Sequence, residues 1–433
     1  MIRWILQGIL RDKNRSLFPF LVVTAGVALV VFTVGFMEGI FMGMIDSTAN
    51  LDTGHLRLVN KPFYDEEHLN PMDRALTSQN EIHQWLRENS DPIIKWAPRI
   101  RWGAIADVPD ENGETKSQTP IIGMALDLLA SDSQEVERLG LKDALVRGRL
   151  PQGPKEILLG YELARSLDVE LDQTITLLGQ TFDGGLATDN YKVVGLVRFG
   201  VFAMDKKMAL IDLADAQDSF YMEDTVTDFL GFLPSHISYK EYKNFKIELQ
   251  SRLNDLRLHP PKDWAKDDFP IVLSVLEQRN LDNMVEVFEM VKKIFVGIIV
   301  LLMVLVLWNA GLLNGIHRYG ELGLLLAMGQ THWKLVWMLG VEAFSIGILG
   351  SLAGSLIGGG GVYYLQEVGI NMGETFAQTG IMMNDVMRGR VTAESFLLGV
   401  GPGIMASVLG SLFASVALFQ RSEANLFREL EAG

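Results

Sequence analysis

The chain has 433 residues, of which 48% are hydrophobic, and no cysteine. This apolar content exceeds what a soluble enzyme of ordinary composition needs, so part of the chain should lie in a membrane. The formal net charge is −15, and the segment from Asp46 to Met290 holds 42 acidic and 26 basic residues, which argues against nucleic acid as a partner. The lack of cysteine excludes thiol catalysis and cysteine-ligated metal sites.

The amino-terminal segment is basic and amphipathic, which predicts a helix at the inner membrane interface. The apolar run behind it is about twice the usual length of a signal peptide, and no small-residue cleavage site ends it. We therefore expect a retained first span. The Lys and Arg residues before it place the amino terminus in the cytoplasm.

Four apolar runs are each long enough to cross about 30 Å of hydrocarbon as a helix. With alternating sides, they predict an α-helical membrane protein with four transmembrane helices and a large domain outside. The predicted parts are a cytoplasmic amphipathic helix (1–17), a first span (18–45), an extracytoplasmic domain (46–283), a stalk and second span (284–313), a cytoplasmic coupling segment (314–334), a third span (335–365), an extracytoplasmic loop (366–395), a fourth span (396–420) and a cytoplasmic tail (421–433).

The outer domain mixes strand and helix patterns, so we expect a mixed α/β fold. Strand-like runs lie at 55–59, 175–178, 191–197 and 208–211, and helical ones at 82–87, 161–167 and 242–256. A helical pattern from Val275 runs into the second span and predicts one continuous stalk helix. Lys292 and Lys293, at the outer end of that span, are expected to snorkel toward water.

Glycines mark the third and fourth spans. Gly350, Gly354 and Gly358 recur at intervals of four, and small residues at this spacing let helix backbones approach closely. In the fourth span, Gly399, Gly401, Pro402 and Gly403 predict a kink. Both features indicate packing within the membrane more than a gating hinge.

No motif for catalysis or nucleotide binding is found. The phosphate-binding pattern G-x-x-x-x-G-K-[ST] is missing, and the cytoplasmic segments are too short for an ATPase domain. The seven histidines are scattered, and no metal or catalytic residue is assigned. We expect a chain that is not an enzyme and carries no cofactor. If ATP and Mg are used, they bind to a separate chain.

The segment between the second and third spans carries the most specific signal. Residues 318–329 read R-Y-G-E-L-G-L-L-L-A-M-G, with an apolar ridge at Leu322 and 324–326 and a glycine stop. This resembles the segment R-x-x-E-I-G-I-L-R-A-L-G-A, followed by a glutamate in the next helix, of the MacB/FtsX-like ABC transporter permease superfamily. In that family the segment forms a helix that docks on the ATPase. Here the resemblance implies coupling through Arg318, Glu321, Gly323, Leu325, Gly329 and Glu342, although a leucine stands where the family has a basic residue.

The resemblance extends over most of the chain. The strand pattern G-H-L-R-L at 54–58 and the run from Gly148 to Leu167 resemble family signatures, and the similarity is closest to the lipoprotein-releasing (LolC/LolE-type) permeases. It implies that the outer domain is like the MacB periplasmic core and that the protein lies in the inner membrane with this domain in the periplasm. The stretch 179–190 is too short for the hairpin hook that binds a lipoprotein carrier in some relatives.

The resemblance implies a function in transport. ATP hydrolysed by a separate ABC ATPase dimer would drive release of a lipoprotein or other lipid-linked cargo from the outer leaflet. The permease would pair with a second copy or a related chain, and a periplasmic carrier or adaptor is a further candidate partner. Cargo would lie between the first two spans, at Met37, Phe41, Met44, Phe288, Met290 and Phe295, because Met and Phe adapt to acyl chains.

Three alternatives stay open. One is a MacB-like exporter of periplasmic peptides or small molecules, which would use an adaptor protein. Another is an FtsX-like signalling subunit that activates a cell-wall hydrolase, although such proteins usually have a much smaller outer domain. The last is a membrane-anchored periplasmic enzyme, which the missing catalytic motifs disfavour.

Overall fold

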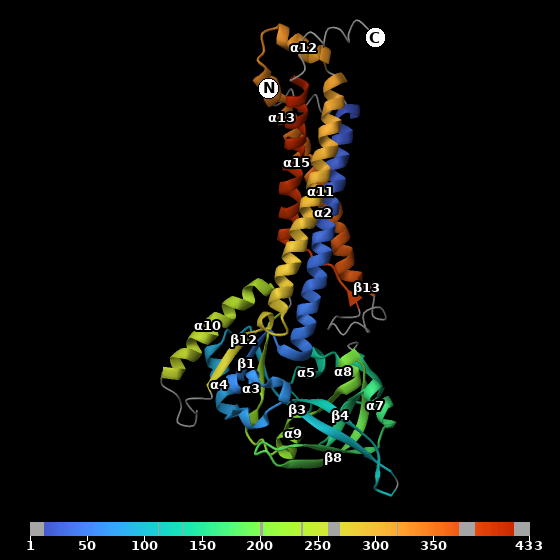
Figure 1. Cartoon of the computed structure of the whole chain (residues 1–433), viewed down its shortest axis with the longest axis vertical. Helices are drawn as coiled ribbons and strands as arrows, with labels where there is room; N and C mark the ends of the chain where they lie inside the picture. The colour runs from blue at the N-terminus through green and yellow to red at the C-terminus, as the bar shows by residue number, and fades with distance from the viewer. Residues whose placement is uncertain are drawn as a thin grey trace. The chain divides into compact units, whose positions relative to one another are not determined.

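The computed structural model describes residues 13–110, 112–131, 133–199, 202–234, 237–258, 269–317, 319–371 and 386–419 (Figure 1). The described chain divides into two compact units. One holds residues up to Phe41, Glu286–Ile370 and the part from Met387 onward, and the other holds Met42–Val285 with Asn371–Val386. Most of the predicted amphipathic helix, the tail 421–433 and half of the predicted outer loop lie outside the described residues.

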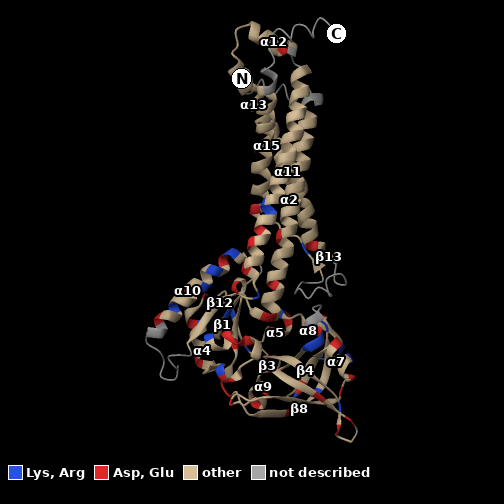
Figure 2. Ribbon diagram, viewed as in Figure 1, with Lys and Arg blue, Asp and Glu red and all other residues tan. Residues whose placement is uncertain are grey.

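Four described helices are long and apolar enough to cross a membrane. They are α2 (Lys13–Thr48), α11 (Leu281–His317), α13 (His332–Val368) and α15 (Ala393–Phe419). Figure 2 shows that their central stretches contain almost no Lys, Arg, Asp or Glu. This matches the four predicted spans, because only an apolar helix satisfies its backbone hydrogen bonds without water.

Glycine lets α13 pack closely on α2. A Cβ atom added at Gly354 would lie 2.5 Å from the carbonyl oxygen of Thr24, and one at Gly358 would lie 2.5 Å from that of Ala28. Neither position could hold a larger residue without moving the backbone of α2. The predicted packing role of this glycine series is therefore what the structure shows. The valines of α2 form the core of the contact with α11 and α15.

The outer unit is built on a ten-stranded sheet, in which nine strands follow the order β12-β1-β11-β3-β4-β9-β6-β8-β5 and β7 is the tenth. β7 pairs with both β3 and β8, so β3, β4, β9, β6, β8 and β7 form a closed ring of strands. Most pairs are antiparallel, and β4 with β9 and β6 with β8 are parallel. The strands are β1 (Leu56–Asn60), β3 (Lys95–Pro109), β4 (Thr115–Leu126), β5 (Leu145–Gly148), β6 (Glu156–Gly160), β7 (Thr174–Gln180), β8 (Leu186–Val197), β9 (Met208–Asp212), β11 (Asp228–Phe232) and β12 (Pro270–Ser274).

Helices cover this sheet, and the core contains the fully buried Trp102 and Tyr191. The predicted mixed α/β domain is confirmed, with strands and helices at each of the predicted runs. The remaining elements are α3 (Lys61–Asp65), β2 (Leu76–Thr77), α4 (Gln79–Asn89), α5 (Glu135–Arg138), α6 (Leu141–Ala144), α7 (Tyr161–Leu167), α8 (Phe202–Lys207), α9 (Leu213–Ser219), β10 (Thr225–Val226), α10 (Tyr239–Leu258), α12 (Tyr319–Ala327), β13 (Ile370–Asn371) and β14 (Val386–Met387).

The stalk helix begins later than the sequence predicted. Ser274 and Glu277 form a capping box that starts a short 3₁₀ turn, Val275–Glu277. Arg279 and Asn280 then take left-handed backbone conformations, with φ of 53° and 57°, and α11 begins only at Leu281. A capping box satisfies the amide groups of one turn but does not commit the chain to a long helix. The prediction of one continuous helix from Val275 was therefore wrong.

The hairpin between β7 and β8 is short. The two strands extend into the stretch 179–190 and leave a turn of five residues, 181–185, closed by a 2.9 Å hydrogen bond from the amide of Thr181 to the carbonyl of Gly185. This agrees with the prediction that the chain lacks a protruding hook here. Leu186, at the start of β8, is 77% exposed.

Candidate functional site

The segment that resembles a coupling helix is α12, and it ends at a glycine as predicted. The amide of Gly329 donates to the carbonyl of Leu326 at 2.9 Å, and the amide of Gln330 donates to that of Leu325 at 3.1 Å. Gly329 has a φ of +86°. This pair of bonds is a Schellman motif, which needs a left-handed residue and therefore favours glycine.

The apolar ridge of α12 is split between two faces. Leu322 is only 2% exposed and packs with Leu335 of α13, and Leu325 is partly buried against the same cluster. Leu324 and Met328, in contrast, are 63% and 64% exposed. Because a helix turns 100° per residue, a run of adjacent leucines cannot lie on one face. The four leucines of the predicted apolar ridge therefore do not share one exposed face of α12.

The other predicted coupling residues differ in their surroundings. Glu321 is exposed, and nothing lies within 4 Å of a Cβ atom added at Gly323. Glu342 is half-buried on α13. Arg318 lies outside the described residues. The described coupling residues therefore lie along α12, at its end and in the first part of α13, and they differ in how exposed they are.

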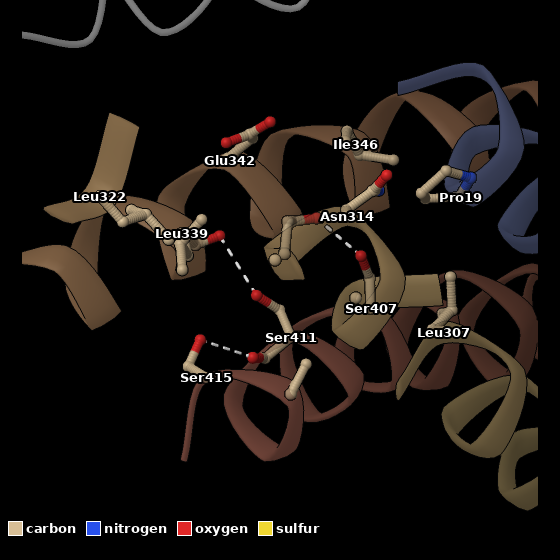
Figure 3. A pocket seen from close by; sticks show the side chains of 14 residues that line it. Pro19, Leu307, Asn314, Leu322, Leu339, Glu342, Ile346, Ser407, Ser411 and Ser415 are labelled. Carbon is tan, nitrogen blue, oxygen red and sulfur yellow. Dashed lines mark hydrogen bonds between the residues drawn. The ribbon is translucent and has the colours of Figure 1, made fainter. Parts of the chain in front are cut away.

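A pocket lies among the membrane helices beside α12. Figure 3 shows Glu342 and Leu322 in its lining, together with three serines of α15. Ser407 Oγ donates to the carbonyl of Ala343 at 2.7 Å, and Ser411 Oγ donates to that of Leu339 at 3.4 Å. These bonds join α15 to α13, so both hydroxyl groups have a hydrogen-bond partner within the two helices. Sequence reasoning missed this pocket, although serines at intervals of four in an apolar helix were a signal for it.

The predicted cargo residues are partly brought together. Phe41 of α2 and Phe288 of α11 stack with ring centroids 4.3 Å apart and planes 10° apart. Phe41 is 6% exposed, so this stack closes the contact between the two helices at this level. Met290, in contrast, is 53% exposed.

The three other predicted cargo residues do not join the aromatic stack. Met37 and Phe295 are half-buried, and Phe295 packs against the core that α2 forms with α11. Met44 is 8% exposed. Of the six predicted cargo residues, Phe41 and Phe288 form an aromatic stack between α2 and α11.

Lys292 is buried and does not snorkel. It is 1% exposed, and its Nζ lies 2.8 Å from Glu289, 2.9 Å from Glu394 and 3.5 Å from Glu38. These carboxylates come from α11, α15 and α2, respectively. The snorkelling expected for Lys292 was wrong, because three carboxylates surround the ammonium and two of them, Glu289 and Glu394, accept hydrogen bonds from it.

A second ionic network lies within the outer unit. Arg57 of β1 and Arg101 of β3 both contact one carboxylate oxygen of Asp228, at 3.2 Å and 3.1 Å. Asp228 is fully buried. Burial would raise the pKa of its carboxyl, but the positive charges of Arg57 and Arg101 outweigh burial, and the pKa lies below its usual value.

The network continues to the two segments that flank the membrane helices. Arg101 forms an ion pair with Asp52, which follows α2, and Asp52 also accepts a 2.9 Å hydrogen bond from Nε of Arg279, which precedes α11. The amide side chain of Gln278 accepts from Arg57 at 3.3 Å. Sequence analysis did not identify these residues, because the partners lie up to 227 positions apart.

Two family models match the chain. Residues 17–244 match the MacB-like periplasmic core domain, and residues 293–422 match the FtsX-like permease C-terminal family. Among solved structures, the periplasmic region of MacB from Actinobacillus actinomycetemcomitans is similar. The match has 11% sequence identity and a TM-score of 0.35, and it covers 55% of this chain and 95% of the MacB chain. No protein with a curated function matches the sequence.

Four apolar helices with a mixed α/β domain between the first and second define a multi-pass membrane protein of the permease class. The MacB-like model alone covers more than half of the sequence. The chain belongs to the MacB/FtsX-like family of ABC transporter permeases. Members of this family are permease subunits and work with an ABC ATPase.

Proposed function

We propose that the chain is the inner-membrane permease subunit of an ABC transporter that extracts lipoproteins or other lipid-linked cargo from the outer leaflet. ATP and Mg bind to a separate ABC ATPase dimer, which docks on α12. A second permease, identical or related, completes the transporter. The observation that carries this proposal is the aromatic contact between Phe41 and Phe288, because it lies between the first two membrane helices at the level predicted for acyl chains.

The described geometry supports a mechanical link between the ATPase and the cargo. α11 runs for 37 residues without interruption from Leu281 to His317, and α12 begins two residues later, at Tyr319. A helix is stiff along its axis, so displacement of α12 would move α11 as a body. Separating α11 from α2 would break the Phe41–Phe288 stack and open an apolar cleft to the outer leaflet.

Apolar side chains at this cleft suit an acyl chain. Burying each CH₂ group contributes about 0.8 kcal/mol, so even part of one acyl chain would offset loss of the aromatic stack, which is worth about 0.5–1.5 kcal/mol beyond its area. A soluble peptide would gain less there. The cleft therefore favours lipid-linked cargo over the periplasmic peptides of a MacB-like exporter.

The exporter is retained as a second candidate on one observation. The β7–β8 turn comprises only residues 181–185 and offers no hook for a lipoprotein carrier. A transporter that hands its cargo to an adaptor needs no such hook. In a heterodimer, the partner permease would supply it instead.

Photo-crosslinking tests the proposal. A photoreactive phenylalanine analogue placed at Phe41 or Phe288, in cells whose lipoproteins carry a labelled acyl chain, should yield labelled adducts of the permease. The matched control is Leu301 of α11, which is 59% exposed and should give no lipoprotein adduct. Equal lipoprotein labelling from Leu301, or labelling by peptides without acyl chains at Phe41 and Phe288, would refute the cargo assignment.

A further inference from the structure

Lys292 is the buried centre of a three-helix charge cluster. It is 1% exposed and lies within a helix whose hydropathy qualifies it as a membrane span. Its Nζ has three carboxylates within 3.5 Å, from Glu38, Glu289 and Glu394. A buried ammonium needs one counter-charge and has three hydrogens to donate. The cluster thus has two more carboxyl groups than are needed to neutralise Lys292.

The three contacts are not equivalent. Glu289 lies one turn before Lys292 on the same helix and moves with it, whereas Glu394 belongs to α15. Glu38 is the member on α2, and its contact of 3.5 Å is the longest. The two shorter contacts, at 2.8 Å and 2.9 Å, leave Lys292 paired even without α2.

The cluster adjoins the aromatic contact between α2 and α11. Glu38 precedes Phe41 by one turn of α2, and Lys292 follows Phe288 by one turn of α11, so each pair shares one helix face. The Nζ of Lys292 lies 5.7 Å from the centroid of the Phe288 ring. The ion pair and the stack therefore form consecutive layers of one contact, which we call the α2–α11 seam (Glu38, Phe41, Phe288 and Lys292).

We propose that Lys292 is a positioning residue that latches the α2–α11 seam through Glu38. In the closed seam, as in this structure, Lys292 bridges all three helices. When the seam opens, Lys292 exchanges its bond to Glu38 for water and stays neutralised by Glu289 and Glu394. Opening then breaks one long ion pair and leaves no isolated cation in an apolar setting, because Lys292 keeps its two shorter contacts.

A purely structural role of the cluster and a latch at Lys292 predict different effects for Glu38 and Glu394. If the cluster only stabilises the bundle, Glu394 matters more than Glu38, because its contact is shorter. If Lys292 is a latch, Glu38 alone controls the separation of α2 from α11. The inference rests on the proposed function only in its claim that the seam opens, and its test needs neither cargo nor ATPase.

Disulfide trapping in the full-length, cysteine-free chain measures the seam directly. Cysteines at Phe41 and Phe288 replace the stacked rings and should form a disulfide rapidly under mild oxidation in membranes. In this background, Glu38→Gln should slow cross-linking about tenfold, because it removes the ion pair that holds α2 to Lys292. Glu394→Gln should change the rate less than twofold.

A second cysteine pair reports on folding. A Cβ atom at Gly347 of α13 would lie 3.2 Å from the Cβ atom of Ser407 of α15, so cysteines there should cross-link in every variant. Glu38→Asp is the milder variant if Glu38→Gln lowers expression. It keeps the charge but shortens a side chain whose contact is already 3.5 Å, and it should slow seam cross-linking severalfold.

Two outcomes would overturn the latch. One is equal slowing by Glu38→Gln and Glu394→Gln, which would make the cluster a general brace of the bundle. The other is an unchanged seam rate in both Glu38 variants while the control pair forms normally. If lipoprotein adducts form at Phe41 but the Glu38 variants do not change the rate of seam cross-linking, the latch is refuted and the cargo assignment stands. If no adducts form but the Glu38 variants slow seam cross-linking, the latch stands and the cargo assignment is refuted.

Discussion

Arg279 donates a 2.9 Å hydrogen bond from its Nε atom to Asp52 across 227 positions of sequence. Asp52 follows the first membrane helix and Arg279 precedes the second, so the pair joins the two segments through which the outer unit begins and ends. Arg101 of β3 completes the link to the sheet. The two segments through which the chain enters and leaves this unit are thereby held by one network of charges.

Asp52→Asn should destabilise the outer unit, because it leaves Arg101 buried without its main counter-charge. Breaking a buried pair from one side commonly costs about 3–5 kcal/mol. Thermal unfolding of the purified full-length protein in detergent, followed by tryptophan fluorescence, measures the loss. The control is Asp65→Asn, which removes an exposed pair with Lys61 and should change stability by at most about 0.5 kcal/mol. Equal stability of the two variants would contradict the network's role.

Acid should weaken the outer unit through Asp228. The pKa of this carboxyl is lower in the folded protein than in the unfolded chain, so its contribution is full above the unfolded value of about 3.9. It is lost as the pH falls through that value toward the folded pKa, because the unfolded state then binds the proton first. Unfolding midpoints at pH 6 and pH 3 measure this loss. Asp228→Asn should show a smaller difference between the two midpoints, and an unchanged difference would assign the acid sensitivity to other groups.

The two faces of α12 should respond differently to charge. Leu324→Asp and Glu321→Lys change exposed positions and should weaken ATPase binding, by roughly thirtyfold for a loss of about 2 kcal/mol. Leu322→Asp buries a carboxylate in the leucine cluster and should lower the thermal stability of the bundle instead. Co-purification of the ATPase and unfolding of the permease separate the two effects. Glu137→Lys, on the outer unit, should affect neither.

If Leu324→Asp and Glu321→Lys retain normal ATPase stoichiometry and cargo-stimulated hydrolysis, α12 does not couple the two subunits. Loss of ATPase binding in Leu322→Asp without a fall in stability would likewise show that the buried face is the docking face. Both results are readable in one set of purified complexes.

The predicted topology places Ser131 outside and Thr331 inside. Both residues lie in exposed positions, and the chain has no cysteine of its own. A cysteine at Ser131 should react with a membrane-impermeant thiol reagent in intact cells, and one at Thr331 should react only after the membrane is opened. Labelling of Thr331 in intact cells would reverse the orientation of the second and third spans.

Hydropathy and local motifs were sufficient for much of the architecture. The four spans, the strands and helices of the outer domain and the glycine stop at Gly329 each depend on neighbouring residues, whose spacing is visible in the sequence. The glycine series of α13 also predicted close packing, because a residue without a Cβ atom lets any neighbouring helix approach closely. The start of α11 was misjudged, since two left-handed residues, Arg279 and Asn280, interrupt an otherwise helical pattern.

The charge clusters depended on tertiary structure. Whether Lys292 reaches water or is buried is set by Glu38 and Glu394, which lie on helices distant in sequence. The same holds for Asp228 between Arg57 and Arg101, and for which leucines of α12 remain exposed. Sequence determines where chains are apolar and where helices can end, because those effects act over a few residues. Only folding decides which charges meet, because an ion pair depends on the distance between side chains and not on their separation along the chain.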